Sequence, residues 1–256
     1  MNACALFIYM GIREWFDKLR KASLARGYTC DICGKELFDY PTRRICEACE
    51  EKLFRPQRTC SKCGRESVAE GICLTCKSRM PSFTQGISPF SYKGEAALIV
   101  NRMKNGDPRL AAYLGEEMAE RFLNVYNGEE DAFLILPVPL TKDRLCERGY
   151  NQAQRLAESV ERRLTERGFE AELDCEVLQK RRETKLQKQA LGKAREENVQ
   201  GAYHVHKRKA CEGKRILLID DIMTTGATGS ECAKLLLSAG AKEIIFLTAT
   251  ARPEQK

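Results

Sequence analysis

Hydrophobic and polar positions alternate in two ways along the chain beyond residue 85. Short apolar runs predict strands at 133–136, 173–178, 216–219 and 243–248. Apolar residues at helical spacing predict helices at 94–104, 109–124, 149–167 and 227–239. Strands that alternate with helices in this way are typical of an α/β fold, in which a mostly parallel sheet is flanked by helices.

The chain before residue 85 has a different pattern. Residues 28–80 contain regularly spaced cysteines but few periodic apolar runs, so this segment needs a cross-link in place of a hydrophobic core. Apolar residues between 12 and 26 predict an amphipathic helix that packs on the rest of the protein, with a basic helix lying on a membrane as the alternative. We therefore expect an N-terminal helix or extension at 1–27, a small module at 28–80 and a larger domain at 85–256. Met1 and Met10 are both candidate first residues.

Composition adds to this picture mainly by exclusion. The 256 residues carry a net charge of +7 and are 43% hydrophobic, which excludes a disordered, collagen-like or coiled-coil protein and fits one or two globular domains. No apolar run approaches the roughly 20 residues of a membrane span. The apolar segment 3–12 lacks the basic start and the cleavage site of a secretory signal. We therefore expect a cytoplasmic protein without a membrane span.

Eight of the 13 cysteines form four C-x-x-C pairs between residues 30 and 76. Four thiolates hold zinc tetrahedrally, and C-x-x-C lets one tight turn present two sulfurs to the same ion. Gly34 and Gly64 each follow the second cysteine of a pair and provide the permissive backbone that such a turn favours. The spacing predicts two structural zinc sites, one with Cys30, Cys33, Cys46 and Cys49 and the other with Cys60, Cys63, Cys73 and Cys76. Because the protein fills all four positions of each site, we expect the module to bind rather than to catalyse.

Other assignments of these cysteines remain open at this stage. The two sites can be interleaved along the sequence, and iron–sulfur ligation or redox disulfides are further alternatives. The two histidines, His204 and His206, share one face of a predicted strand, but without further ligands they do not predict a metal site.

Residues 215–229 read R-I-L-L-I-D-D-I-M-T-T-G-A-T-G, an apolar strand followed by two carboxylates and a Thr/Gly turn that opens a helix. The first N–H groups of a helix lack intrahelical partners and lie at the positive end of its dipole, so a phosphate can bind there. Thr224, Thr225 and Thr228 can add hydroxyl hydrogen bonds. Asp220 and Asp221 suit the vicinal hydroxyls of a sugar or a divalent metal ion. A strand that ends in ordinary helix-capping residues is the alternative.

A P-loop ATPase also places an acidic residue at the end of an apolar strand. Such a protein needs G-x-x-x-x-G-K-[ST], and the sequence contains no such segment. The ATPase interpretation is therefore excluded.

Residues 217–228 resemble the 5-phosphoribosyl-1-diphosphate (PRPP) binding motif of the type I phosphoribosyltransferases. Further stretches are similar to the competence protein F family: L-P-V-P-L at 136–140, R-G-Y-N-Q at 148–152, T-x-x-Q at 184–187, R-x-x-N-x-x-G at 195–201, and Y-K-G at 92–94 leading to R-M-K at 102–104. With its cysteine-rich N-terminus, the chain is identified as a member of this family, which is associated with DNA uptake in natural transformation.

The resemblance implies a type I phosphoribosyltransferase-like domain, preceded by a double zinc ribbon, that binds PRPP with Mg²⁺. Asp220 and Asp221 would be the catalytic pair that holds the ribose 2′- and 3′-hydroxyls. The 5′-phosphate would be surrounded by Thr224, Thr225, Gly226, Ala227 and Thr228. The turn that would face the diphosphate contains Leu140, Thr141, Lys142 and Arg144. Magnesium would bridge diphosphate and ribose oxygens.

A basic stretch follows the predicted strand at 173–178, and residues 178–215 carry a net charge of +8. By the resemblance, a mobile loop would fold over the leaving diphosphate, neutralise it and exclude water; its basic residues are Arg181, Arg182, Lys185, Lys188 and Arg195. A solvated basic face or a nucleic-acid contact is the alternative. Arg148, Asn151 and Gln152 either meet the acceptor substrate or cap a helix.

Two functions from different classes fit these observations. The first is a phosphoribosyltransferase that acts on an acceptor not specified by the sequence, with a zinc module that caps the site or recruits a partner such as a protein of the DNA-uptake machinery. The second is a single-stranded DNA-binding protein that keeps the fold as a PRPP sensor or scaffold without turnover. Net charges of +5 on residues 1–85 and +8 on 178–215 favour contact with phosphates. Phe83, Phe90 and Tyr92 are either base-stacking residues or core residues. The oligomeric state is not predicted.

Overall fold

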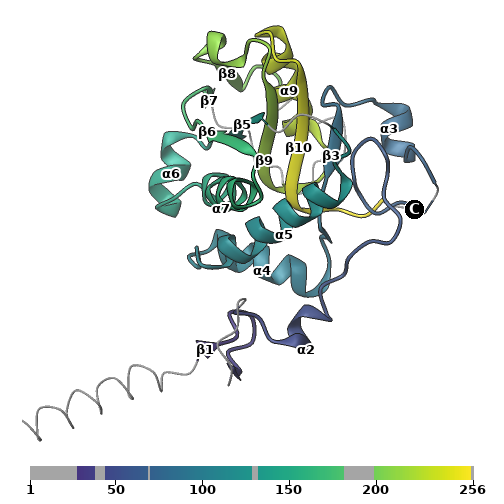
Figure 1. The fold of residues 1–256 in the computed structure, drawn as a ribbon, viewed down its shortest axis with the longest axis vertical. Coiled ribbons are helices and arrows are strands. Elements are labelled where there is room, and N and C mark those ends of the chain that lie inside the picture. The colour runs from purple at the N-terminus through teal and green to yellow at the C-terminus, as the bar shows by residue number, and fades with distance from the viewer. Residues whose placement is uncertain (1–27, 38–43, 69, 129–131, 182–198, 255–256) are drawn as a thin grey trace, which may run out of the picture. The chain divides into compact units, whose positions relative to one another are not determined.

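The computed structural model describes residues 28–37, 44–68, 70–128, 132–181 and 199–254 (Figure 1). Residue contacts divide the chain into two compact units, residues 1–50 and residues 51–256. The module expected at 28–80 therefore has residues in both units. The helix expected within 12–26 lies outside the described residues. Among the described helices, none combines the length and the apolar character that a membrane crossing requires.

The first unit contains a short hairpin and one turn of helix. β1 (Tyr28–Thr29) pairs antiparallel with β2 (Glu36–Leu37), and α2 (Glu47–Glu50) follows. In the turn between the strands, Gly34 has φ 75°, and its N–H donates to the Cys30 carbonyl at 2.8 Å. Glycine adopts this left-handed conformation without a steric penalty, which is why it occupies this position.

The second unit is built on a parallel sheet. Its six strands are β3 (Gln85–Ile87), β4 (Phe90–Ser91), β5 (Ala132–Pro137), β6 (Glu170–Leu173), β9 (Arg215–Met223) and β10 (Glu243–Ala251). The strand order is β3-β10-β9-β5-β6, β4 pairs further along β10, and every pairing in this sheet is parallel. The predicted α/β fold with a mostly parallel sheet is confirmed.

Helices pack on both faces of this sheet (Figure 1). The helices that contact the sheet are α4 (Gly94–Lys104), α5 (Leu110–Val125), α7 (Gln152–Glu166) and α9 (Ala227–Ser238). The same unit also contains α3 (Leu74–Ser78), α6 (Lys142–Arg148) and the short helix η1 (Arg208–Cys211). Leu218 of β9 packs in one buried cluster with Leu236 of α9. Side chains of adjacent strand residues point to opposite faces, so Leu217 faces the other side of the sheet. Helix α5, which contacts β10, and helix α7, which contacts β9, cover that side of the sheet.

The structure corrects two predicted elements. The strand predicted at 173–178 is wrong, because β6 ends at Leu173 and the next strand, β7 (Leu178–Lys180), pairs antiparallel with β8 (Tyr203–Val205). Asp174 causes the break, since its side chain accepts a hydrogen bond from the Glu176 N–H at 2.8 Å and forms a turn.

The helix predicted at 149–167 begins three residues late, at Gln152. Gly149 has φ 75° and ends the preceding helix α6, and the Asn151 side chain caps the start of α7 by accepting from the Ala153 N–H. The other three predicted helices match α4, α5 and α9 to within one residue at each end.

The strand order reverses between β5 and β9. From β5 the chain continues outward to β6, whereas from β9 it continues in the opposite direction to β10. In open α/β sheets, ligands bind at such a reversal, beyond the carboxyl ends of the strands. The Val138 N–H donates to the Ile219 carbonyl at 2.8 Å, which brings the segment after β5 beside the end of β9.

Candidate ligand site and cysteine centres

The two predicted carboxylates lie on β9, which continues through them to Met223 rather than ending at residue 219. The Asp221 N–H donates to Asp220 Oδ1 at 2.8 Å. Asp221 Oδ2 lies 3.0 Å from the Nζ of Lys104, the last residue of α4, and the two side chains are 13% and 22% exposed. Strand β9 and helix α4 together therefore form a largely buried ion pair at the reversal point of the sheet.

The carboxyl group of Asp220 is a much weaker acid than an ordinary aspartate. Burial and the charge of Asp221 raise the pKa of its carboxyl from 3.8 to about 7, against the smaller lowering effects of the Asp221 N–H, Lys104 and Lys180. Two neighbouring carboxylates in a partly dry site do not both ionise easily. A ligand that offers hydroxyl donors or positive charge stabilises the ionised form.

The turn after β9 leads directly into α9. Gly226 has φ 83° and precedes the first helical residue, Ala227. The Ala227 N–H donates to Thr225 Oγ1 at 3.3 Å. Thr228 lies in the first turn of α9. The predicted residues 224–228 thus lie at the N-terminus of a 12-residue helix, where the helix dipole favours an anion.

The four residues expected to face a diphosphate follow β5. Leu140 is partly buried, and Thr141 caps α6 by accepting from the Arg144 N–H at 3.4 Å. Lys142 is exposed, and the Arg144 guanidinium pairs with Glu147 at 3.3 Å. The structure places Leu140 and Thr141 on the loop after β5 and Lys142 and Arg144 in the first turn of α6, and the Thr141 hydroxyl already serves as the helix cap.

The predicted basic loop lies mostly outside the described residues. Of its five residues, the structure describes Arg181, which is exposed and whose N–H donates to the Ala202 carbonyl at 2.8 Å. The other four, Arg182, Lys185, Lys188 and Arg195, fall in the segment 182–198. Among the aromatic residues, Phe83 and Phe90 are fully buried, so they are core residues rather than surfaces for stacking.

The conspicuous R-G-Y-N-Q segment shapes the loop after β5. Asn151 accepts from the Ala153 N–H at 3.1 Å and donates to the Val138 carbonyl at 3.1 Å. The Arg148 guanidinium donates to the Gln152 side chain at 3.0 Å. These contacts fix the start of α7 to the end of β5, as the capping alternative predicts.

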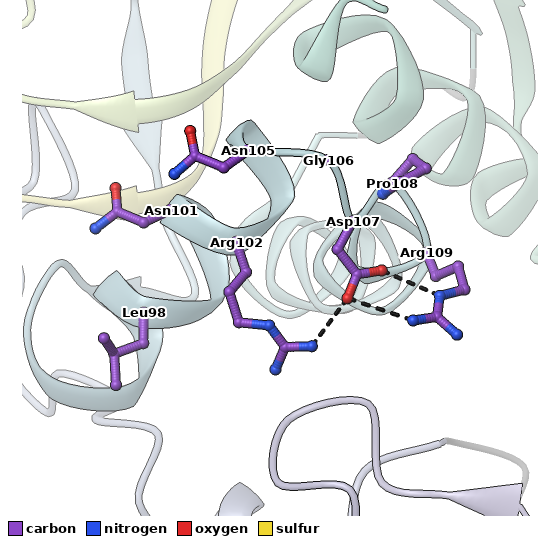
Figure 2. Close-up of a pocket in the computed structure, with 8 residues that line it drawn as sticks. All are labelled: Leu98, Asn101, Arg102, Asn105, Gly106, Asp107, Pro108 and Arg109. Carbon is purple, nitrogen blue, oxygen red and sulfur yellow. Dashed lines mark hydrogen bonds and ion pairs between the residues drawn. The ribbon is translucent and has the colours of Figure 1, made fainter. Parts of the chain in front are cut away.

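A surface pocket lies where α4 turns into α5 (Figure 2). Its charged groups bind one another: Asp107 accepts from Arg102 at 2.9 Å and from Arg109 at 3.0 Å. Burial opposes ionisation of Asp107, but Arg109 and Arg102 outweigh it and lower the pKa of the carboxyl. Because its cations already have a carboxylate partner, we assign no ligand to this pocket.

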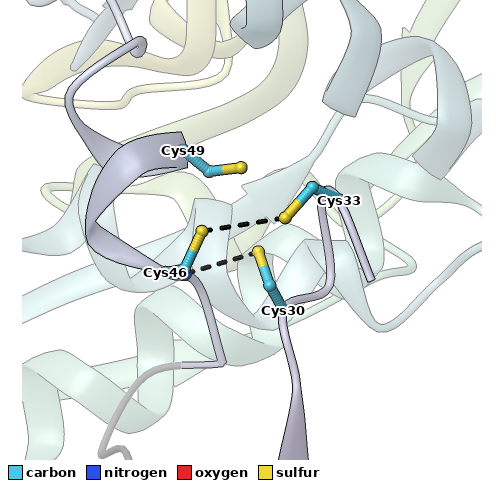
Figure 3. A group of neighbouring side chains, drawn as sticks. All are labelled: Cys30, Cys33, Cys46 and Cys49. Carbon is cyan, nitrogen blue, oxygen red and sulfur yellow. Dashed lines mark hydrogen bonds between the residues drawn. The ribbon is translucent and has the colours of Figure 1, made fainter. Parts of the chain in front are cut away.

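The first cysteine group comes from both parts of the small unit (Figure 3). Cys30 and Cys33 lie in the connection between β1 and β2, whereas Cys46 directly precedes α2 and Cys49 lies within it. Cys33 is exposed and the other three are buried. Burial acts against ionisation of Cys30, but backbone N–H donors outweigh it and lower the pKa of its thiol to about 7.

The second group, Cys60, Cys63, Cys73 and Cys76, is fully buried and belongs to the larger unit. Its sulfurs join the same hydrophobic cluster as Leu218 and Phe246 of the sheet. Burial again opposes ionisation of Cys60, yet the N–H groups of Cys73, Cys63 and Lys62 lower the pKa of its thiol to about 7. The structure therefore groups the cysteines in sequential, not interleaved, order.

Both groups fit a zinc ion. Four Zn–S bonds of about 2.3 Å in a tetrahedron separate the sulfurs by about 3.8 Å. The Cys33 and Cys46 sulfurs lie 3.7 Å apart, the Cys63 and Cys73 sulfurs lie 3.8 Å apart, and all four ligand atoms of each group lie within 4.8 Å of one another. These sets of four thiols have the size and chemistry of structural zinc sites.

Comparisons with known proteins agree with this architecture. A model of the phosphoribosyl transferase domain matches residues 148–256. Competence protein ComFC of Bacillus subtilis (strain 168) is 28% identical over 222 residues, which cover 83% of this chain and 86% of ComFC. Competence protein F of Haemophilus influenzae is 28% identical over 209 residues, with coverage of 78% and 87%. DNA utilization protein YhgH of Escherichia coli (strain K12) is 25% identical over 207 residues, with the same coverage.

The fold and the domain match define a phosphoribosyltransferase-like protein of the type I class, with cysteine groups N-terminal to the domain. Within that class, the chain is a homologue of ComFC, competence protein F and YhgH over most of its length. The resemblance to the competence protein F family that the sequence motifs indicate is confirmed.

Proposed function

We propose that this protein binds PRPP together with Mg²⁺ at the carboxyl end of β9. The observation that carries the proposal is that Asp220, Asp221 and the N-terminus of α9 adjoin one another where the strand order reverses. This arrangement offers carboxylates to sugar hydroxyls and helix N–H groups to a phosphate, at a spacing of a few residues. PRPP carries both groups on one ribose.

Each part of the ligand has a proposed partner. The 5′-phosphate binds residues 224–228, the ribose hydroxyls donate to Asp220 and Asp221, and the diphosphate faces the segment 140–144, which leads from β5 into α6. Magnesium, bound mostly through ligand oxygens, neutralises part of the diphosphate charge. Transfer of the phosphoribosyl group would depend on positioning and electrostatic stabilisation of an oxocarbenium-like ribose, with no covalent protein nucleophile.

The biological setting that we propose is DNA uptake. Two relatives are named competence proteins and a third a DNA utilization protein. The zinc ribbons then serve to recruit partners, and reduced thiols suit a cytoplasmic location. In this setting the protein either transfers the phosphoribosyl group to an acceptor or senses PRPP.

The test of the PRPP site is a paired substitution. We expect Asp220→Asn with Asp221→Asn to abolish PRPP binding in calorimetry while zinc content and folding are kept. The matched control is Glu170→Gln with Glu212→Gln, which removes two exposed carboxylates on the opposite side of the sheet, at the first residue of β6 and on the turn that precedes β9. Unchanged PRPP affinity in the aspartate variant would show that Asp220 and Asp221 do not form the PRPP site.

A second candidate function is single-stranded DNA binding that uses the fold as a PRPP sensor or scaffold. The observation that favours it is the net charge of +8 on residues 178–215. Clustered Lys and Arg residues bind phosphates by releasing condensed counterions, so this binding would weaken steeply with salt.

A further inference from the structure

Arg65 connects the second cysteine group with the turn after β9. Its Nε donates to Cys63 Sγ at 3.2 Å, and its Nη2 donates to the Thr224 carbonyl at 3.0 Å. The residue is only 5% exposed. We infer that Arg65 is a positioning residue through which zinc at Cys60, Cys63, Cys73 and Cys76 sets the conformation of the phosphate-binding turn. The inference rests on the proposed PRPP site, whose regulation it describes.

The cysteine end of this connection is held firmly against the sheet. The Gly86 N–H of β3 donates to the Lys62 carbonyl at 2.8 Å. A Cβ atom at Gly64 would lie 2.3 Å from the Gly86 carbonyl oxygen, and one at Gly86 would lie 2.4 Å from the Cys63 carbonyl oxygen. Because both positions are glycine, the backbone of the cysteine turn can contact the backbone of the edge strand β3. The backbone next to Arg65 is therefore held in place.

The other end of the connection orients a peptide group. The carbonyl of Thr224 and the N–H of Thr225 belong to one planar trans peptide and point in opposite directions. Because Arg65 holds the carbonyl toward the cysteine group, the Thr225 N–H points away from that group. Backbone N–H groups are the donors that a phosphate uses at a helix start, and turning this peptide would remove one of them.

The metal explains why an arginine suits this position. Four thiolates around one divalent zinc ion carry a net charge of about −2, which a guanidinium partly neutralises. The planar fork of arginine directs separate N–H groups to the sulfur and to the carbonyl, which a lysine ammonium cannot do in the same geometry. Without zinc, the four sulfurs no longer bind a shared metal ion. The Cys63 sulfur that accepts from Arg65 is then no longer held in place.

Residues 58–76, the segment that carries the second cysteine group and is called the ribbon below, keep other contacts that do not involve the Arg65 side chain. The Ser67 hydroxyl donates to Glu254 at 3.0 Å, and the Leu74 N–H donates to the same carboxylate at 2.6 Å. Glu66 accepts from Ser91 at 2.7 Å. Removing the Arg65 side chain therefore leaves the ribbon attached to the domain, so a change in the turn reports on the connection itself.

Two measurements on the zinc-loaded full chain test the inference. Hydrogen exchange of the ligand-free protein follows the peptide that contains residues 219–230, and calorimetry with PRPP and Mg²⁺ gives the affinity. We expect Arg65→Ala to accelerate exchange of this peptide and to weaken PRPP binding at least about ten-fold, because a charge-assisted hydrogen bond is lost. Two zinc ions per chain should remain. Arg58→Ala removes an exposed cation from the same ribbon and should resemble the wild type in both measurements.

The outcomes separate this inference from the proposed function. Wild-type exchange and affinity in Arg65→Ala would overturn the inference while leaving PRPP binding intact. A wild-type protein that fails to bind PRPP would overturn the proposed function, and the exchange comparison would still decide whether Arg65 orders the turn. If Arg65→Ala loses zinc, Arg65→Lys keeps the charge but not both hydrogen bonds, and the same faster exchange is expected with zinc retained.

Discussion

Lys104 at the end of α4 forms an ion pair with Asp221 on β9, with 3.0 Å between Nζ and Oδ2. Because both side chains are mostly buried, this pair is less screened by solvent than a surface pair. Lys104 offsets negative charge in a site that we propose for a strongly anionic ligand. It therefore belongs to the proposed site, although it lies far from the Asp220–Thr228 motif in the sequence.

Lys104→Met should weaken PRPP binding by about ten-fold, because the substitution keeps the apolar stem but leaves one more uncompensated negative charge beside the ligand. Calorimetric titration measures the change. Arg102→Met is the control, since Arg102 belongs to the same helix but pairs with Asp107. Equal affinities for the Lys104 variant and the wild type would show that the ion pair is only structural.

The pKa of Asp220 predicts a pH dependence of stability. Because the folded state raises this pKa from 3.8 to about 7, the folded protein keeps a proton that the unfolded chain releases above about pH 4. The contribution of Asp220 to stability therefore decreases as the pH rises from about 4 to about 7. Asp107, Glu120 and Asp174, whose pKa values are lowered, lose their contributions only at lower pH.

Denaturant unfolding at pH 5 and pH 8 tests this dependence. Asp220→Asn should be more stable relative to the wild type at pH 8 than at pH 5, because the wild-type carboxyl loses its contribution progressively between about pH 4 and pH 7, whereas the amide is neutral at both values. A stability difference that does not vary between these pH values would contradict the raised pKa.

The two zinc sites should differ in their effect on the larger unit. Cys73→Ser removes a ligand that is 1% exposed within the core cluster, so we expect it to lower the melting temperature of the phosphoribosyltransferase-like unit by more than about 5 °C. Cys33→Ser changes an exposed ligand in the small unit and should leave that transition unchanged.

Elemental analysis provides the companion measurement. The wild type should contain about two zinc ions per chain, and each variant should contain one fewer. Fewer than one zinc ion in wild-type protein prepared without chelators would defeat the two-site prediction.

The basic stretch predicts salt-sensitive binding of single-stranded DNA. The triple variant Lys185→Ala, Lys188→Ala and Arg195→Ala should bind an oligonucleotide more weakly and with a shallower dependence on salt, since fewer counterions are released. A triple variant at the exposed residues Arg155, Arg162 and Lys234 changes the net charge equally and serves as the control. If both triple variants behave alike, the DNA contact lies elsewhere or only net charge matters.

The sequence predicts well those features that depend on local patterns. Strand β9 and helix α9 follow from an apolar run and helical spacing, and the cysteine groups follow from C-x-x-C spacing because a tight turn brings two sulfurs together. The break after Leu173 has a local signal in Asp174 that the apolar run conceals. The end of α6 at Gly149 likewise has a signal in its glycine.

Lys104 and Arg65 could not be recognised from the sequence in the same way. Each reaches the site across the fold, to Asp221 and to the Thr224 carbonyl. Such contacts depend on how α4 and the second cysteine group pack on the sheet, which no local periodicity encodes. Lys104 belongs to a motif that resembles the competence protein F family, but the motif alone does not show its partner.

The most direct test of the central proposal is calorimetric titration of the zinc-loaded wild-type protein with PRPP and Mg²⁺, compared with ribose 5-phosphate. We predict saturable binding of PRPP that is clearly tighter than that of ribose 5-phosphate, because the latter lacks the diphosphate. Absence of binding at millimolar PRPP would contradict the proposal, and DNA binding by a protein that keeps the fold as a scaffold would then be the better account.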